Sequence, residues 1–412
     1  PQADDSEKRG RPTPMNRDAF LELAGQIMTL PTAPYHEQFV GDAVAEFAAR
    51  RPQLVMSSDD FGNLLLLYDG DKEETASGGR RGRRRPRLVV TAHMDHPGMA
   101  FAKRLSGPDF LFERLGGVPE DLSRDGKVDI FRLDRPSHQK PIRGRIIACV
   151  SPAAGGSEFR IRVGRDDSDQ VGPGSFAMLA LRPLEARKRR LRARACDDLA
   201  GVTAGLCFLD ELLSRHSPIR AGLLLTRAEE AGLGGMLAAA RSGSLDRRAL
   251  YVNIECSSCR AGAQLGAGPV VRVGDRISLF DPQITGGLVA VAAELTKAAA
   301  GADRPFRYQR KLMDGGTCEA TVLTRAGYGV GAVALPLKNY HNAGRNGLRP
   351  EIIDLDDAVW LVELLVGVAL HPAGVTGAFK RSGKEMDRAM GARKREQARR
   401  LRRQRSGRPT HS

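Results

Sequence analysis

The sequence predicts an α/β fold, in which helices flank a mostly parallel sheet and a small β-rich domain is inserted between two strands. Three observations support this prediction. In residues 15–100 and 191–375, short apolar runs bounded by turn residues alternate with segments of helical periodicity, as parallel strands joined by helices do. Residues 101–190 contain short β-like runs and no long helical period. At 41% hydrophobic and 27% charged residues, the 412-residue chain has the composition of a globular protein with a large core.

The individual elements follow from the spacing of apolar residues. Helices are predicted where apolar residues recur every three to four positions, at 15–28, 37–49, 201–213, 234–242, 288–300 and 354–370. Strands of the main sheet are predicted at short apolar runs between turn residues, at 64–68, 88–92, 221–226, 249–254 and 329–335. The inserted block contributes β-like runs at 128–133, 145–150, 158–163 and 176–182. The run 88–92 is almost wholly apolar, so we expect it to be buried on both faces.

The formal net charge of +15 is concentrated in two segments. The Arg-rich run at 80–87 carries +6 and residues 380–412 carry +10, so the rest of the chain is close to neutral. We predict that residues 1–14 form a disordered leader and that 376–412 form a basic disordered tail. The near-neutral body is then the part expected to carry the function.

The basic tail raises nucleic acid as an alternative partner, because clusters of Lys and Arg bind phosphate. Residues 380–412 contain no Phe, Trp or Tyr for base stacking and no recognisable nucleic-acid-binding motif. Nucleic acid is therefore not expected to define the function.

The sequence also predicts where the protein works. No stretch approaches the roughly 18 consecutive apolar residues of a membrane span, and the first ten residues are polar, without a signal-peptide core. Six cysteines are too few for a disulfide scaffold, and the single C-x-x-C pair of Cys256 and Cys259 is a weak sign of zinc. We expect a cytoplasmic protein without a membrane partner.

Histidines and carboxylates follow several predicted strands, which is where ligands bind in open α/β sheets. His93 comes directly after the strand 88–92 and two residues before Asp95. An imidazole so placed can bind a metal while the carboxylate fixes its tautomer, although a surface-loop histidine is the alternative. Asp197 and Asp198 lie at a helix start, where helix capping accounts for Asp198. Two adjacent carboxylates repel each other, which favours a cation at Asp197.

Glu229 and Glu230 follow the strand 221–226 and precede a Gly-rich turn. One carboxylate of such a pair can bind a metal while the other takes a proton from metal-bound water; a solvated acidic loop is the alternative. Glu255 ends another strand and His341 follows the last one, and each alone is more often a satisfied polar group. Together, two imidazoles and at least three carboxylates form a mixed N/O set that suits Zn, Co or Mn.

The order of these motifs resembles that of the co-catalytic two-metal aminopeptidases, a group of zinc-dependent exopeptidases. The motifs are H-x-D at 93–95, D-D-x-x-G at 197–201, E-E-x-G-x-x-G at 229–235, the acid at 255 and the late histidine at 341. The chain is most similar, over roughly residues 15–370, to the TET-type family of glutamyl, lysyl and deblocking aminopeptidases, which are relatives of the cellulase-like peptidases.

The resemblance implies two divalent cations per chain, with zinc preferred over cobalt or manganese. The implied ligand sets share one bridging residue, and they are His93, Asp197 and Glu255 for one cation and Asp197, Glu230 and His341 for the other. A water between the cations would be the nucleophile, Glu229 the general base, and Asp95 a further catalytic residue beside His93.

The resemblance also implies partners. Peptides would be the substrates and would lose residues from the N-terminus. The insertion at 101–190 would be a dimerisation domain, within a homo-oligomer between a dimer and a dodecamer.

Several positions depart from the family pattern. His96 stands where an acid is common, Leu199 replaces an Arg, Glu255 stands where Asp is more frequent, and Cys318-Glu319 replaces Asp-Ala after a Gly-Gly-Thr segment. The departures leave the ligand set intact and put the substrate preference in question. A related dipeptidase, deacylase or carboxypeptidase therefore stays as an alternative, as does an inactive relative that binds nucleic acid through its tail.

Overall fold

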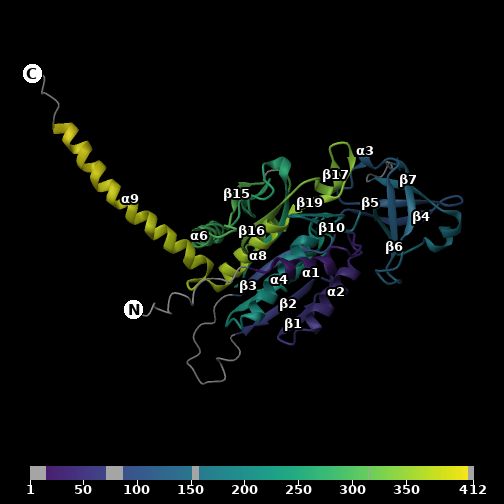
Figure 1. Cartoon of the computed structure of the whole chain (residues 1–412), viewed down its shortest axis with the longest axis horizontal. Helices are drawn as coiled ribbons and strands as arrows, with labels where there is room; N and C mark the ends of the chain where they lie inside the picture. The colour runs from purple at the N-terminus through teal and green to yellow at the C-terminus, as the bar shows by residue number, and fades with distance from the viewer. Residues whose placement is uncertain (1–14, 71–86, 151–156, 314, 407–412) are drawn as a thin grey trace, which may run out of the picture.

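The computed structural model describes residues 15–70, 87–150, 157–313 and 315–406. An eight-stranded sheet with helices on both faces forms the body, a small barrel lies at one end, and a long helix projects from the other (Figure 1). The architecture confirms the predicted α/β fold class. The expected leader and residues 71–86 of the Arg-rich loop lie outside the described residues.

The main sheet brings the ends of its parallel strands to one edge. Its strands run in the spatial order β1 (Leu54–Ser58), β2 (Leu64–Asp69), β12 (Arg220–Thr226), β3 (Leu88–His93), β13 (Leu250–Ser258), β16 (Gly329–Leu337), β14 (Val270–Gly274) and β15 (Gln309–Leu312). The central strands β12, β3, β13 and β16 are parallel, whereas β2 and β14 pair antiparallel to their inner neighbours. Every residue of β3 is buried, as its apolar run predicts.

Helices cover both faces of the sheet because alternate strand residues point to opposite sides. Val90 and Ala92 join the core on one face, whereas Val89 joins a separate core on the other. The first face is covered by α1 (Arg17–Ile27), α2 (Gln38–Ala49), α4 (Leu199–Ser214), α6 (Pro282–Ala298) and α8 (Leu355–Leu370). The second face is covered by α5 (Gly234–Ser242) and α7 (Glu319–Arg325). The sheet is therefore dry on both sides, and its polar residues gather at the strand ends.

The β-rich block forms a closed barrel. Its strands are β4 (Gly98–Arg104), β5 (Asp109–Leu115), β8 (Glu158–Val163), β7 (Ile142–Val150), β6 (Lys127–Arg132) and β9 (Ser175–Leu179), in that order around the barrel, with the short helix α3 (Glu120–Ser123). Phe110, Phe112 and Phe159 fill its interior and are fully buried.

The barrel starts and ends earlier than the expected limits of 101 and 190. The hairpin of β10 (Leu184–Arg187) and β11 (Arg190–Ala193) pairs with β19 (Glu351–Asp354) and so belongs to the other unit. This boundary is invisible in the sequence because β10 and β11 have the same β-like character as the barrel strands. A last short hairpin joins β17 (Ala343–Gly344) to β18 (Gly347–Leu348).

The predicted disordered tail is instead a helix, α9 (Gly374–Ser406). Its composition is rich in Arg, Ala and Lys, all strong helix formers, and its first turns pack on α6. Val375 is buried there, and Arg381 pairs with Glu294 of α6. Low complexity and high charge suggested disorder, but local propensity and this docking contact favour the helix.

Within the described ranges, no single helix is long and apolar enough to cross a bilayer. Helices α8 and α9 meet such a criterion only jointly, and they are bent by 87° at their junction.

The contact between α6 and α9 depends on Gly286 and Gly287 of α6, and Gly287 provides the first prediction. A Cβ on Gly287 would overlap the carbonyl oxygen of Val375. We expect Gly287→Ala to lower the melting temperature and to speed proteolysis within α9, even though Ala is intrinsically the better helix former. Gly25→Ala in α1, where nothing lies within 4 Å of the added Cβ, is the matched control and should stabilise by about 0.5–1 kcal/mol. Equal stabilisation by both substitutions would contradict the packing described here.

Candidate active site

The predicted site residues lie together at the carboxyl edge of the parallel strands. His93 is the last residue of β3 and lies beside Thr226, the last residue of β12, so the Glu229-Glu230 pair emerges next to it. Glu255 lies within β13, two strands from β12, and His341 follows β16.

One group of potential ligands centres on His93. Its Nε2 lies 3.5 Å from Asp197 Oδ1 and 4.0 Å from Glu229 Oε2. One ligand atom each of His93, Asp197 and Glu255 lies within 4.8 Å of the others, and all three side chains are buried. This group matches the first predicted ligand set in composition.

A second group centres on His341. Its Nε2 lies 3.0 Å from Glu230 Oε1 and 3.8 Å from Asp197 Oδ2. Asp197 therefore turns one oxygen toward each histidine and belongs to both groups, which is the geometry that a bridging carboxylate requires. This group matches the second predicted set.

Several atoms of the two groups are buried without a hydrogen-bond partner among the described residues. They are Asp197 Oδ1, Glu255 Oε1 and His341 Nε2, the last of which lies 3.0 Å from Glu230 Oε1 but without the geometry of a hydrogen bond. An unpaired buried polar atom costs about 1–3 kcal/mol, and more if it is charged. Because these atoms converge and are chemically suited to divalent cations, the residues present fit the implied metal.

Cys256 also lies near the cluster, in a group with Asp197 and Asp198. Its Sγ lies 3.9 Å from Asp198 Oδ1, whereas Cys259 is in none of the candidate groups. Asp198 occupies the N-cap position of α4, but its side chain makes no capping hydrogen bond. The capping interpretation of Asp198 is therefore wrong in detail.

The pKa values report a crowded acid cluster. Burial raises the pKa of Glu255 to about 8 and that of Glu229 well above its usual range, with neighbouring acids adding to both shifts. Burial would lower the pKa of His341, but the nearby carboxylates of Glu230 and Asp197 outweigh it and raise that pKa to about 9. The cluster thus retains protons when no other cation neutralises it, and divalent cations would displace them.

Asp95 does more than the sequence predicts. The ring Nδ1 of His93 lies 3.1 Å from the carbonyl oxygen of Asp95 and 3.5 Å from its Oδ1. The two carboxylate oxygens of Asp95 accept hydrogen bonds from the backbone N–H groups of Glu229 and Glu230, each at 3.0 Å. One buried acid therefore links the β3 and β12 segments of the site.

Glu351 plays a similar part on the other side, and sequence reasoning missed it. Its Oε2 accepts hydrogen bonds from the backbone N–H groups of Cys196 and Asp197 at 2.8 and 3.0 Å, and its Oε1 accepts one from that of His341 at 2.8 Å. Glu351 is fully buried in β19. The only sequence signal is an acid beside two isoleucines in a short strand.

The barrel unit also contributes to the wall of the site. A Cβ on Gly117, which follows β5, would overlap the ring of His341, and one on Gly116 would contact Glu230. His96 contacts the backbone of Asp197, since its Nδ1 lies 2.6 Å from that carbonyl oxygen. His96, which stands where an acid is common in the family, therefore supports the segment that carries Asp197. The Gly116-Gly117 pair is the sequence signal for the close approach of the barrel to His341 and Glu230.

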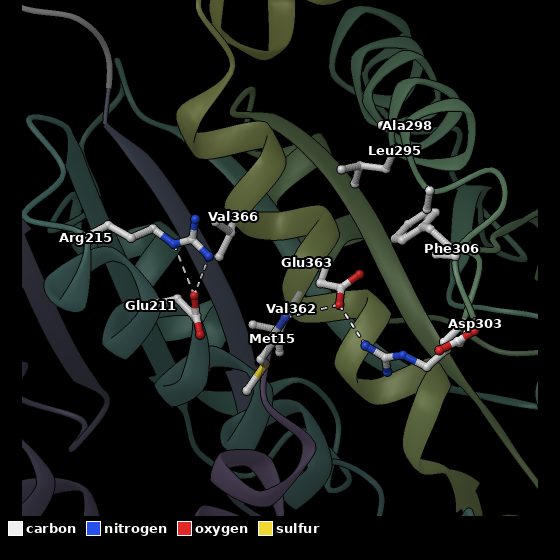
Figure 2. A pocket seen from close by; sticks show the side chains of 13 residues that line it. Met15, Glu211, Arg215, Leu295, Ala298, Asp303, Phe306, Val362, Glu363 and Val366 are labelled. Atoms are coloured by element: carbon white, nitrogen blue, oxygen red, sulfur yellow. Dashed lines mark hydrogen bonds and ion pairs between the residues drawn. The ribbon is translucent and has the colours of Figure 1, made fainter. Parts of the chain in front are cut away.

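A cavity of about 550 Å³ lies elsewhere, beside α4, α6 and α8 (Figure 2). Leu295, Phe306 and Val366 form apolar walls, and a Glu211–Arg215 pair lies at its edge. None of the predicted site residues, all of which are described, lines this cavity. This cavity is therefore separate from the acid cluster, which lies at the carboxyl edge of the parallel strands.

Glu351 provides the second prediction. Replacing Glu351 with Gln turns an amide N–H₂ toward a backbone N–H, which should loosen Asp197 or His341 and weaken binding of divalent cations at least tenfold, measured by competition with a chromogenic chelator. Asp357→Asn is the matched control, because Asp357 is also buried and accepts hydrogen bonds from two backbone N–H groups, those of Gly266 and Gly268 at 2.7 Å. A similar loss of cation affinity in both variants would show a general folding defect instead.

Comparison with known proteins gives a consistent picture. The model of the M42 glutamyl aminopeptidase family matches residues 77–361. The fold is similar to a TET aminopeptidase from a marine sediment archaeon of the Thaumarchaeota, with a TM-score of 0.70 and 16% identity over 89% of this chain and 100% of that one. It is similar to an aminopeptidase from the archaeon Desulfurococcus kamchatkensis, with a TM-score of 0.68 and 20% identity over 89% and 98%.

A third similar structure is the TET1 peptidase of Pyrococcus horikoshii, which can assemble into a tetrahedron or a large octahedral shell. Its TM-score is 0.67, with 18% identity over 85% of this chain and 99% of that one. The family match confirms the predicted TET-type resemblance and the predicted enzyme class, a hydrolase of the aminopeptidase type. The chain belongs to the M42 glutamyl aminopeptidase family.

Proposed function

We propose that this chain is a two-metal aminopeptidase that removes N-terminal residues from peptides, with Glu229 as the general base. The observation that carries the proposal is the position of Asp197, whose two oxygens face two separate groups of ligand atoms. A site for one cation needs no such shared carboxylate, and a site without cations would leave the buried acids uncompensated.

The proposed ligands follow the two groups. His93, Asp197 and Glu255 would hold one divalent cation, and Asp197, Glu230 and His341 the other. The mixed imidazole and carboxylate set suits zinc, with cobalt or manganese as alternatives. When bound, such a pair of cations supplies Lewis acidity, which polarises a carbonyl oxygen and lowers the pKa of a water held between them.

Glu229 is suited to carry the proton. Its carboxylate lies beside His93 and is nearly buried, and the hydrogen bond from its backbone to Asp95 fixes the segment that bears it. Burial raises the pKa of Glu229, which makes its carboxylate a stronger base than that of an exposed glutamate. In the proposed reaction Glu229 takes a proton from the attacking water and passes it to the leaving amine.

The charge of the site favours a peptide amino terminus. The candidate groups contain five carboxylates, one more than the four positive charges of two divalent cations, so a free ammonium group is attracted and a C-terminal carboxylate is repelled. Glu255, where related aminopeptidases more often have Asp, keeps a dipeptidase, deacylase or carboxypeptidase as the second candidate. An aminopeptidase needs a free amino terminus on its substrate, whereas a carboxypeptidase needs a free carboxyl terminus and a deacylase an acylated amino group.

Substrate ends provide the third prediction. The metal-loaded protein should hydrolyse peptides with a free amino terminus and should fail on the same peptides after N-acetylation, because acetylation removes the charge that the site attracts. The products can be followed by mass spectrometry. Cleavage confined to N-acylated peptides or to the C-terminal residue would refute the aminopeptidase and favour the second candidate.

Glu229 provides the fourth prediction. Glu229→Gln keeps the shape of the side chain and removes the base, so turnover should fall by about 10²–10⁴-fold, the usual contribution of general acid–base catalysis, while cation binding is kept. Glu230→Gln is the neighbouring control and should instead weaken cation binding. Normal turnover in the Glu229 variant would exclude the assigned role.

We also propose that the chain forms a homo-oligomer in the cytoplasm. The similar structures include one that assembles into closed shells, and the barrel from β4 to β9 is the candidate dimerisation unit. All six cysteines are free, as suits a reducing compartment. The assembly can be checked as a solution mass in multiples of the 44.6 kDa chain.

A further inference from the structure

Helix α9 carries a basic stripe along one side. Five residues spaced by four, seven, four and three positions form it: Lys384, Arg388, Arg395, Arg399 and Arg402. At roughly 100° per residue, these five positions fall within about 60° of one another around the helix. All five side chains are exposed, and the three acids of the helix, Glu385, Asp387 and Glu396, lie outside this sector.

The stripe lies opposite the apolar side by which α9 is attached, and Arg381, which shares the angular sector of the stripe, pairs with an acid of α6, Glu294. Val375 and Phe379 contact Gly287 and Gly286 of α6, and their side of the helix lies opposite the basic stripe. The attached side continues outward with Met386 as an exposed apolar residue, so beyond Arg381 the basic side is not turned toward the body. Figure 1 shows α9 leaving the body at the end opposite the barrel.

The chemistry of the stripe matches a row of phosphates. Its positions span 19 residues, or about 27 Å of helix, and four of its five cations are Arg, whose guanidinium groups bind phosphate oxygens in a forked geometry. None of the residues from 380 to 402 is aromatic, so the helix offers no platform for base stacking. Contacts with a phosphodiester backbone, without reading of sequence, are what this surface can make.

A membrane surface fits the helix less well. An interfacial helix buries a broad apolar face between flanking cations. Among the described side chains of α9 beyond the α6 contact, the exposed large apolar ones are Met386, Met390 and Leu401. The two methionines lie across the helix from the basic stripe. The arrangement would turn the stripe away from anionic headgroups when the apolar side is buried.

We propose that the basic stripe of α9 binds the phosphodiester backbone of nucleic acid and tethers the enzyme to it. The binding is independent of sequence and of the chemistry at the strand edge. It adds a polyanion partner to the peptidase and gives a function to the charge that dominates the C-terminal region.

The test measures affinity of the full-length protein for labelled RNA and DNA duplexes of mixed sequence, by fluorescence anisotropy over a range of salt concentrations. Each phosphate contact contributes about −0.9 to the slope of log K against log salt on B-DNA, so five contacts predict a slope of about −4.5. Binding of either duplex supports the proposal, and the tighter one identifies the natural source.

Two triple variants with the same loss of charge separate the stripe from net charge. R388Q/R395Q/R399Q removes three stripe cations and should make the slope shallower by about 2.7. R393Q/K394Q/R400Q removes three cations outside the stripe and should leave the slope nearly unchanged. Circular dichroism checks that both variants keep α9, since Gln and Arg have similar helix propensities. Peptidase turnover should be normal in both.

Three results would overturn the proposal. Equal losses of slope in both triple variants would show that binding depends on overall charge and not on the stripe. Absence of salt-dependent binding by the wild-type protein would show that α9 does not bind nucleic acid. Binding to phosphatidylserine vesicles that M386Q/M390Q abolishes, with duplex binding absent, would assign α9 to a membrane surface instead.

Discussion

The constraint that shapes the candidate site is the burial of several carboxylates around Asp197. Such a cluster is costly unless its charge is neutralised and its geometry is held. Two further acids, Asp95 and Glu351, fix the geometry of the cluster. They accept hydrogen bonds from backbone N–H groups that lie 134 and 154 residues away in the sequence. These long-range hydrogen bonds join the strand ends into one site, and the cations that the cluster is suited to bind would supply the missing charge.

The arrangement of the sheet explains why this is possible. Because β12, β3, β13 and β16 are parallel and dry on both faces, their polar residues collect at one edge. The barrel is more than an appendage, since Gly117 comes so close to His341 that a larger residue would displace the ring. The proposed assembly unit therefore lies next to the proposed catalytic centre.

Much of this was predictable from sequence because the relevant signals are local. A carboxylate or imidazole at the end of an apolar strand or at a helix start stands out, and so the sequence predicted His93, Asp197 and Glu230 as ligands, which the structure brings close together. Glu351 was missed because its role lies in contacts with residues far along the chain, and no nearby pattern marks it. The helical state of α9 was missed because its charge suggested disorder, whereas helix propensity and the contact with α6 decide the matter.

Asp197 is proposed to bridge two cations. Anomalous diffraction from crystals of the zinc-loaded protein, recorded on both sides of the zinc edge, tests it most directly. Two anomalous peaks per chain are expected, one on each side of the Asp197 carboxylate and about 3.5–4 Å apart. A single peak, or peaks away from Asp197, would contradict it.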